Sequence, residues 1–210
     1  MKDENIDNKI TEKLEIEIYE KTLDIEIDYT ELVIDNITEN DLLKEIPIVK
    51  TLVAFYNISS SFIARHNVKK ILVFLKEFHT RNIDEFKLAN FKAKFVRDSI
   101  YKEQVLETVL VLNEKFIEVV QSKILANLFK AHIEEHISWV EFNQLAFALN
   151  SLNPAGYDFL HRKCKEEKWS DKDGEAFMYS CGIGHLDGLK FTITETGHKL
   201  YEFGIKPLRN

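Results

Sequence analysis

Glycine, proline and cysteine are scarce in this sequence of 210 residues, which contains seven glycines, three prolines and two cysteines. Few chain breakers favour helices, because glycine and proline most often interrupt regular structure. Two cysteines give no disulfide framework, and no CxxC pair is present to bind zinc. We therefore expect Cys164 and Cys181 to be buried free thiols in a protein of a reducing compartment.

Long apolar runs are also missing. The residues after Met1 lack the apolar core of a signal peptide, which favours a cytoplasmic location. The run from Thr51 to Ala64 has 14 uncharged residues, whereas a helix needs roughly 20 to cross a bilayer. We interpret this run as a buried core helix. Its basic flank, which includes Arg65 and Lys69, keeps membrane contact through residues 46–72 as the alternative.

The net charge of −7 is unevenly distributed. Residues 1–45 hold 15 acidic and 5 basic side chains, residues 46–154 hold 11 and 14, and residues 155–210 hold 9 of each. We treat residues 1–40 as an acidic N-terminal segment. Such a segment repels nucleic acid and suits a basic partner, although a solvated surface is the simpler interpretation.

The stretch from Phe116 to Leu152 predicts a helical hairpin around which the rest of the chain is organised. Ser138 and Glu141 match the S-x-x-E capping box that begins a helix, and a short turn near His136 separates the two halves. Apolar residues recur every three or four positions in both halves. They are Phe116, Val120, Ile124, Leu128 and Ala131 before the turn, then Trp139, Phe142, Leu145, Leu149 and Leu152.

Several elements are expected ahead of the hairpin. Residues 14–27 alternate apolar and charged side chains, so a strand is favoured there, with a helix as the alternative; a helix is favoured over 29–37. Asp84 is expected to begin a helix that carries Phe86, Phe91 and Phe95, and another helix is expected over 99–113. Residues 68–78 predict an amphipathic helix, with Val68, Ile71, Leu72, Leu75 and Phe78 facing inward.

The C-terminal part changes character. Helices are expected over 156–169 and 172–181, followed by a hairpin at the glycines near residues 182–188. Thr194 is expected to cap a last helix that stops at Gly204. The ending resembles the Y-x-L-T-x-x-G-x-x-L pattern of bacterial winged-helix regulators, through Phe191, Ile193, Thr194, Gly197 and Leu200.

The expected fold is therefore mainly α, with a helical bundle over residues 41–153 and a winged-helix-like α+β unit over 154–210. The segments IPIVKTLVAFYN, KKILVFL and ISWVEF resemble a group of uncharacterised bacterial helical proteins, and the hairpin resembles tellurite-resistance-type helical domains. These resemblances imply a bacterial protein that serves a stress or phage-defence system. They bring no catalytic residues that can be placed on this chain.

Three patterns in the sequence resemble chemical sites. Residues His132 to His136 match the H-x-x-E-H zinc-protease motif, but a helix that ends near Glu135 would take His136 off the face that holds His132. A nucleophilic pair of Cys181 and His185 is a weaker alternative. The glycines at 182, 184 and 188 miss the G-x-G-x-x-G spacing by one residue. We expect no metal, no cofactor and no catalysis.

A winged helix that reads DNA needs a basic recognition helix. The expected helix here begins with Asp171, Asp173 and Glu175 against Lys172. Nucleic acid is therefore disfavoured as a partner. The sequence favours a non-enzymatic protein that binds another protein, or a further copy of itself, with a membrane-associated effector and a DNA-binding regulator as alternatives.

Overall fold

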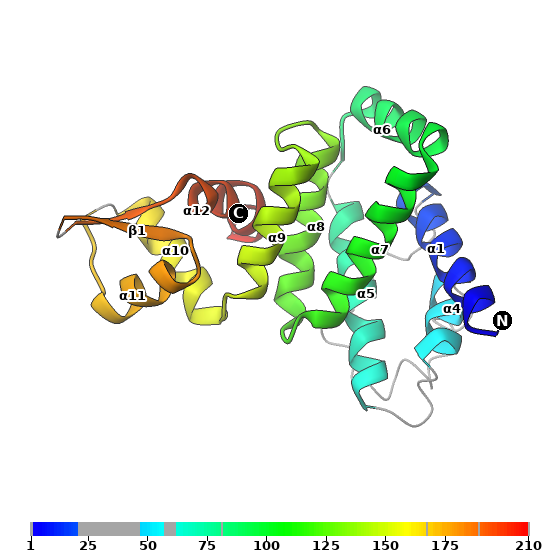
Figure 1. Cartoon of the computed structure of the whole chain (residues 1–210), viewed down its shortest axis with the longest axis horizontal. Coiled ribbons are helices and arrows are strands. Elements are labelled where there is room, and N and C mark those ends of the chain that lie inside the picture. The colour runs from blue at the N-terminus through cyan, green and yellow to red at the C-terminus, as the bar shows by residue number, and fades with distance from the viewer. Residues whose placement is uncertain are drawn as a thin grey trace. The chain divides into compact units, whose positions relative to one another are not determined.

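The computed structural model describes residues 2–20, 47–56, 62–80, 82–166, 168–188 and 190–209, and it is mainly helical (Figure 1). The chain divides into two compact units, residues 1–122 and 123–210. The predicted helical fold class is confirmed at this level, together with the small two-stranded sheet near the C-terminus. The division expected at residues 153–154 stays a prediction about domain organisation.

Unit 1 is built from helices that pack against one another in pairs. Helix α1 packs on α4, α4 on α5, α5 on α7, and α6 on α7. Aromatic and aliphatic side chains fill the space between them. The helices are α1 (Lys2–Glu20), α4 (Pro47–Tyr56), α5 (Phe62–Thr80), α6 (Glu85–Arg97) and α7 (Ser99–Lys115).

The strand predicted over 14–27 is wrong for the residues up to Glu20, which continue helix α1. The buried residues Ile10, Leu14 and Ile18 recur every four positions, whereas Ile16, which a strand would place beside Leu14, is only half-buried. Packing against α4 selects the helical period over the alternating one. The rest of the predicted strand and the helix predicted over 29–37 lie outside the described residues.

The apolar run at Thr51–Ala64 does not lie in one described helix. Helix α4 ends at Tyr56 and α5 begins at Phe62, and the residues between them are not described. Leu52 is fully buried, in line with the core interpretation, but Phe62 and Ile63 are 66% and 72% exposed. None of the helices described is both long enough and apolar enough to span a bilayer.

The amphipathic pattern predicted within α5 is confirmed, because all five residues expected to face inward are buried. The predicted cap of α6 is confirmed as well, since the backbone N–H of Lys87 donates to Asp84 Oδ1 (2.9 Å). Within α6 the three phenylalanines separate. Phe91 and Phe95 are buried, whereas Phe86 is 70% exposed.

The helical hairpin predicted within Phe116–Leu152 is confirmed as α8 (Val119–Ile133) and α9 (Trp139–Asn150). The capping box is complete: the N–H of Glu141 donates to Ser138 Oγ (3.2 Å), and the N–H of Ser138 donates to Glu141 Oε2 (2.7 Å). Phe116 is buried but precedes α8, at the end of α7. The apolar residues Ile124, Leu128, Phe142, Leu145 and Leu149 are buried, as the spacing predicts.

The remainder of unit 2 follows the predicted order of elements. Strand β1 pairs antiparallel with β2, and His185 faces Thr192 across the ladder. Thr194 caps α12, because the N–H of Gly197 donates to Thr194 Oγ1 (3.1 Å). The elements are α10 (Pro154–Lys165), α11 (Lys172–Ser180), β1 (Gly184–Asp187), β2 (Lys190–Ile193), α12 (Glu195–Lys199), the π-helical turn η1 (Leu200–Ile205) and the 3₁₀ turn η2 (Lys206–Arg209).

Two glycines near the C-terminus serve close packing. The predicted helix stop at Gly204 is wrong, because the helical backbone continues through Ile205. A Cβ at Gly204 would lie 2.7 Å from Ile124 Cγ2, so glycine lets η1 approach α8. A Cβ at Gly197 would lie 2.5 Å from the carbonyl oxygen of Ile183. The absence of a side chain at Gly197 therefore permits α12 to contact the segment before β1.

Candidate functional site

The H-x-x-E-H pattern lies at the turn between α8 and α9. Glu135 has a positive φ of 63°, the N–H of His136 donates to the carbonyl of Ala131 (2.9 Å), and the N–H of Glu135 donates to the carbonyl of His132 (3.0 Å). This bonding is the Schellman arrangement that ends a helix. The helix therefore ends before His136, as the sequence predicted.

The two histidines of the pattern have different partners. The ring of His132 lies 5.3 Å from that of Trp139, and its Nδ1 is 3.1 Å from the carbonyl oxygen of Ile137. The ring of His136 stacks on Phe203 with the centroids 5.6 Å apart. Across the described parts of the chain, no three side chains of the metal-binding kinds gather at one point.

Cys181 and His185 also have separate partners. The thiol of Cys181 donates to the carbonyl of Ser151 (3.4 Å), and burial raises its pKa. His185 Nε2 lies 3.0 Å from Thr192 Oγ1 across the β1–β2 ladder. The structure does not bring the predicted nucleophile and base together.

A different cysteine and histidine lie near each other in the fold, and the sequence pattern did not predict it. Cys164 Sγ lies 4.0 Å from His198 Nδ1, although the two residues are 34 positions apart, so no local pattern signals the pair. They line a hollow of about 430 Å³ with Tyr201. Burial raises the pKa of the Cys164 thiol to about 11, and Glu202 acts in the same direction. The thiol is therefore protonated at neutral pH and is a weak nucleophile.

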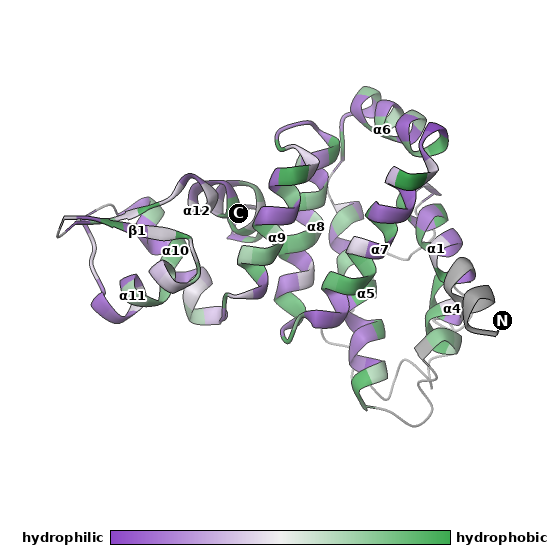
Figure 2. Ribbon diagram, in the orientation of Figure 1, coloured by the Kyte–Doolittle hydropathy of each residue, from purple (hydrophilic) through white to green (hydrophobic). Residues whose placement is uncertain are grey.

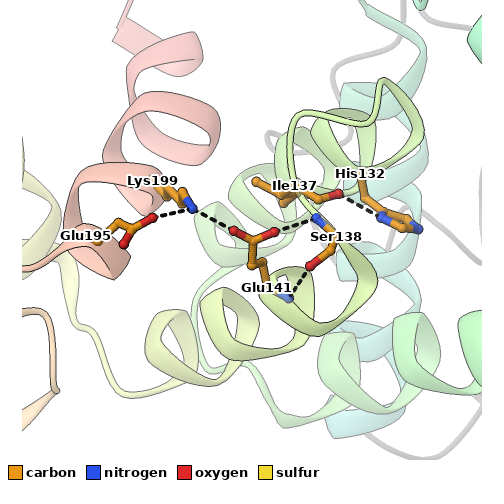
Figure 3. A network of polar contacts seen from close by, with 6 residues as sticks. All are labelled: His132, Ile137, Ser138, Glu141, Glu195 and Lys199. Atoms are coloured by element: carbon orange, nitrogen blue, oxygen red, sulfur yellow. Dashed lines mark hydrogen bonds and ion pairs between the residues drawn. The ribbon is translucent and has the colours of Figure 1, made fainter.

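A polar network joins α9 to α12 (Figure 3). Lys199 Nζ lies 2.6 Å from both Glu141 Oε1 and Glu195 Oε1. The hydrogen bond from Lys199 and that from the Ser138 backbone hold the pKa of the Glu141 carboxyl at about 2. Glu141 thus acts twice, in the cap of α9 and in the ion pair. The network links the start of α9 to α12.

Helix α11 is the one that would read DNA in a winged helix, and its acidic residues were expected to be exposed. Glu175 is an exception. This side chain is buried and accepts from Ser170 Oγ and Lys172 Nζ, both at 2.9 Å. Burial raises its pKa, but the bonds from Lys172 and Ser170 outweigh it, and the net pKa is lowered. Glu175 therefore does not face a phosphate backbone, while Asp171 and Asp173 remain exposed.

The strongest candidate for a binding surface is the outer stripe of α6, which we define as Phe86, Ala89, Ala93 and Val96. All four side chains are exposed, Phe86 by 70% and Val96 by 82%. Their spacing of three, four and three residues places them on one face of the helix. Figure 2 shows hydrophobic residues interspersed with hydrophilic ones along α6.

The opposite face of α6 holds the helix in unit 1. Phe91 and Phe95 are buried and lie 5.1 Å apart, and the ring of Phe95 also meets Tyr19 (5.8 Å) and Tyr101 (6.2 Å) edge-on. These contacts fix α6 against α7 and α1. The outer stripe is consequently held in a defined orientation by a rigid aromatic cluster.

A hollow of about 600 Å³ lies beside the outer stripe, at the junction of α6 and α7. Asn90, Ala93, Lys94 and Arg97 line it from α6, and Ile100, which is 69% exposed, lines it from α7. Lys94 Nζ lies 3.6 Å from the ring centroid of Tyr101. The hollow therefore has an apolar edge and a polar edge, on which two basic residues lie with one acidic residue, Asp98.

Comparison with models of protein families, with curated proteins and with solved structures gave no significant match. The candidate surface therefore rests on its own geometry and chemistry.

Proposed function

We propose that this chain is a non-enzymatic bacterial protein that works by binding another protein, as a subunit of a complex. The observation that carries the proposal is the exposed outer stripe of α6. Contiguous apolar patches that stay exposed, especially ones rimmed by polar residues, mark interaction sites on protein surfaces. Phe86, Ala89, Ala93 and Val96 form such an exposed apolar stripe along one face of α6, with Lys94 and Arg97 beside it.

The cost of exposure supports this proposal. Burying an apolar side chain fully stabilises by about 1.5–3 kcal/mol relative to leaving it in water. A helix that places Phe91 and Phe95 in a core could carry polar residues on its other face without loss of stability. A partner that covers Phe86 and Val96 recovers the free energy that the isolated chain forgoes.

The resemblances to bacterial helical proteins support a role in a stress or phage-defence system, located in the cytoplasm. Both cysteines are free thiols, which suits a reducing compartment. The winged-helix-like tail, with Glu175 turned inward and Asp173 exposed, supports contact with protein rather than DNA.

Affinity purification of the tagged chain tests the proposal. Val96→Glu places a charge on the outer stripe without touching the core, and Gln104→Glu adds the same charge at an exposed position of α7. We expect a partner protein in stoichiometric amount with the wild type and with Gln104→Glu, and its loss with Val96→Glu. Equal recovery with all three proteins would contradict a role for α6.

Membrane association is a second candidate, favoured by Phe62 and Ile63. These residues are 66% and 72% exposed in the first turn of α5, and Arg65 and Lys69 follow them. Apolar side chains flanked by basic ones suit an anionic membrane surface. Flotation with anionic vesicles tests it: binding that disappears in Phe62→Asp and Ile63→Asp, and not in Val96→Glu, would establish membrane contact.

A further inference from the structure

We propose that the outer stripe of α6 docks an acidic amphipathic helix of the partner protein, side by side with α6. This inference rests on the proposed function and adds the chemical class of the partner segment. It follows from three features of α6: the spacing of its exposed apolar residues, the size of those residues, and the charge beside them.

The spacing selects a helix as the occupant. Phe86, Ala89, Ala93 and Val96 occupy the a, d, a and d positions of two consecutive heptads. Such a seam matches a second helix that carries apolar residues at the same spacing. A flat surface or an extended strand does not repeat its side chains every 3.5 residues.

The sizes of the four residues favour close approach. Ala89 and Ala93 lie one helical turn apart in the middle of the stripe, with the larger Phe86 and Val96 at its two ends. Helix axes pack at about 8–10 Å, and small contact residues give the shorter distances. A partner helix is therefore seated over the alanines and bounded at both ends.

The charge beside the stripe selects an acidic partner. Helix α6 carries four basic residues, Lys87, Lys92, Lys94 and Arg97, against one acidic residue, Glu85. Two basic residues, Lys94 and Arg97, and one acidic residue, Asp98, line the hollow on one edge of the stripe. Carboxylates of a docked helix would meet these donors, and arginine binds a carboxylate through two parallel N–H groups.

The same charges argue against two other occupants. A second copy of α6 would bring one basic helix against another, which like charges oppose. A membrane surface favours bulky apolar residues at the centre of the inserted face, where α6 has Ala89 and Ala93.

Two stapled helical peptides of about three heptads serve as probes. Both carry leucine at a and d; one carries glutamate at the flanking positions, and the other carries lysine. We expect the full-length wild-type chain to bind the glutamate peptide at least about tenfold more tightly than the lysine peptide, with an affinity that falls as salt rises. Fluorescence anisotropy measures both affinities.

Variants of the full-length chain complete the test. Val96→Glu should abolish binding of the glutamate peptide; if that variant fails to fold, Ala93→Gln blocks the same seam. The double variant Lys94→Glu with Arg97→Glu should reverse the preference between the peptides. Gln104→Glu should leave both affinities unchanged.

Four results would overturn the inference. They are binding of neither peptide, equal binding of both, a wild-type dimer that Val96→Glu converts to a monomer, and flotation of the wild type but not of Val96→Glu with anionic vesicles. If the purified partner is lost with Val96→Glu while neither peptide binds, the proposed function survives and the acidic helix is excluded. If recovery of the partner is the same with Val96→Glu as with the wild type, the proposed function of α6 is wrong, whatever the peptides do.

Discussion

Glu135 holds a backbone conformation that costs free energy for any residue with a Cβ. Its φ of 63° lies in the left-handed region, where the Schellman turn usually has glycine. We expect Glu135→Gly to raise the free energy of unfolding by roughly 1 kcal/mol, because glycine removes the steric cost. Chemical denaturation measures this change.

Glu135→Ala is the matched control for this prediction. It removes the same side chain and keeps the Cβ, so it should not stabilise the protein. Equal effects of glycine and alanine would mean that the backbone at Glu135 carries no steric cost.

Lys70 is a buried basic residue of α5 whose side chain contacts the C-terminal end of α7. It is 1% exposed, and its Nζ donates to the carbonyls of Glu114 (2.8 Å) and Phe116 (2.6 Å), which α7 leaves without helical partners. Burial lowers the pKa of Lys70 to about 8, against a partial opposing effect of Glu114. The amine thus joins α5 to α7 at an electrostatic cost while it is charged.

The pH dependence of this cost can be measured. Above pH 8 the folded chain holds fewer protons at Lys70 than the unfolded chain, so the stability contribution of Lys70 rises with pH until the unfolded amine also titrates. We expect the free energy of unfolding of the wild type, relative to Lys70→Met, to increase between about pH 8 and pH 10. A constant difference over that range would show that the pKa of Lys70 is not lowered.

At the scale of a single element, the start of α9 tests the hairpin. The side chain of Ser138 accepts from the N–H of Glu141, so Ser138→Ala should cost about 1 kcal/mol of stability. Val140→Ala is a suitable comparison, because Val140 is 65% exposed in the same turn. An unchanged thermal midpoint in Ser138→Ala would contradict the capping box.

Glu141 gives the same element an acid-sensitive contact. Hydrogen bonds from Lys199 and Ser138 lower its folded pKa to about 2, so its stabilising contribution is complete above its ordinary pKa and is lost as pH falls toward 2. We expect Glu141→Gln to lower the thermal midpoint clearly at pH 7 and much less at pH 3. An equal difference in thermal midpoint between wild type and Glu141→Gln at both pH values would show that the contact with Lys199 does not lower the pKa of Glu141.

Local signals explain why some elements could be predicted and others could not. Asp84, Ser138 and Thr194 cap helices through bonds to residues three positions ahead, and such spacing is visible in the sequence. Two periods fitted the residues of α1, and only packing against α4 decides between them. Gly204 has the composition of a helix stop, but its role depends on Ile124, 80 positions away.

The outer stripe of α6 could not be predicted from the sequence either, because distant contacts decide which face of α6 is buried. Helix α6 has one apolar stripe through Phe91 and Phe95 and another through Phe86, Ala89, Ala93 and Val96, and both have helical spacing. The sequence could not tell which stripe lies in the core, because that depends on the distant Tyr19 and on Tyr101. The exposed heptad became recognisable only when the buried face was known.

For the whole molecule, the central claim is that the chain acts by binding a protein at the outer stripe of α6. Because Val96 is 82% exposed, a photoreactive benzoylphenylalanine there would face the partner without disturbing the core. The same group at Gln104, an exposed position of α7, is the control. Irradiation of the purified complex is followed by mass spectrometry of the crosslinked peptides.

We expect one covalent adduct from position 96, joined to a helical, acidic segment of the partner, and none from position 104. Adducts of equal yield from both positions, or none from position 96 while the complex remains intact, would contradict it.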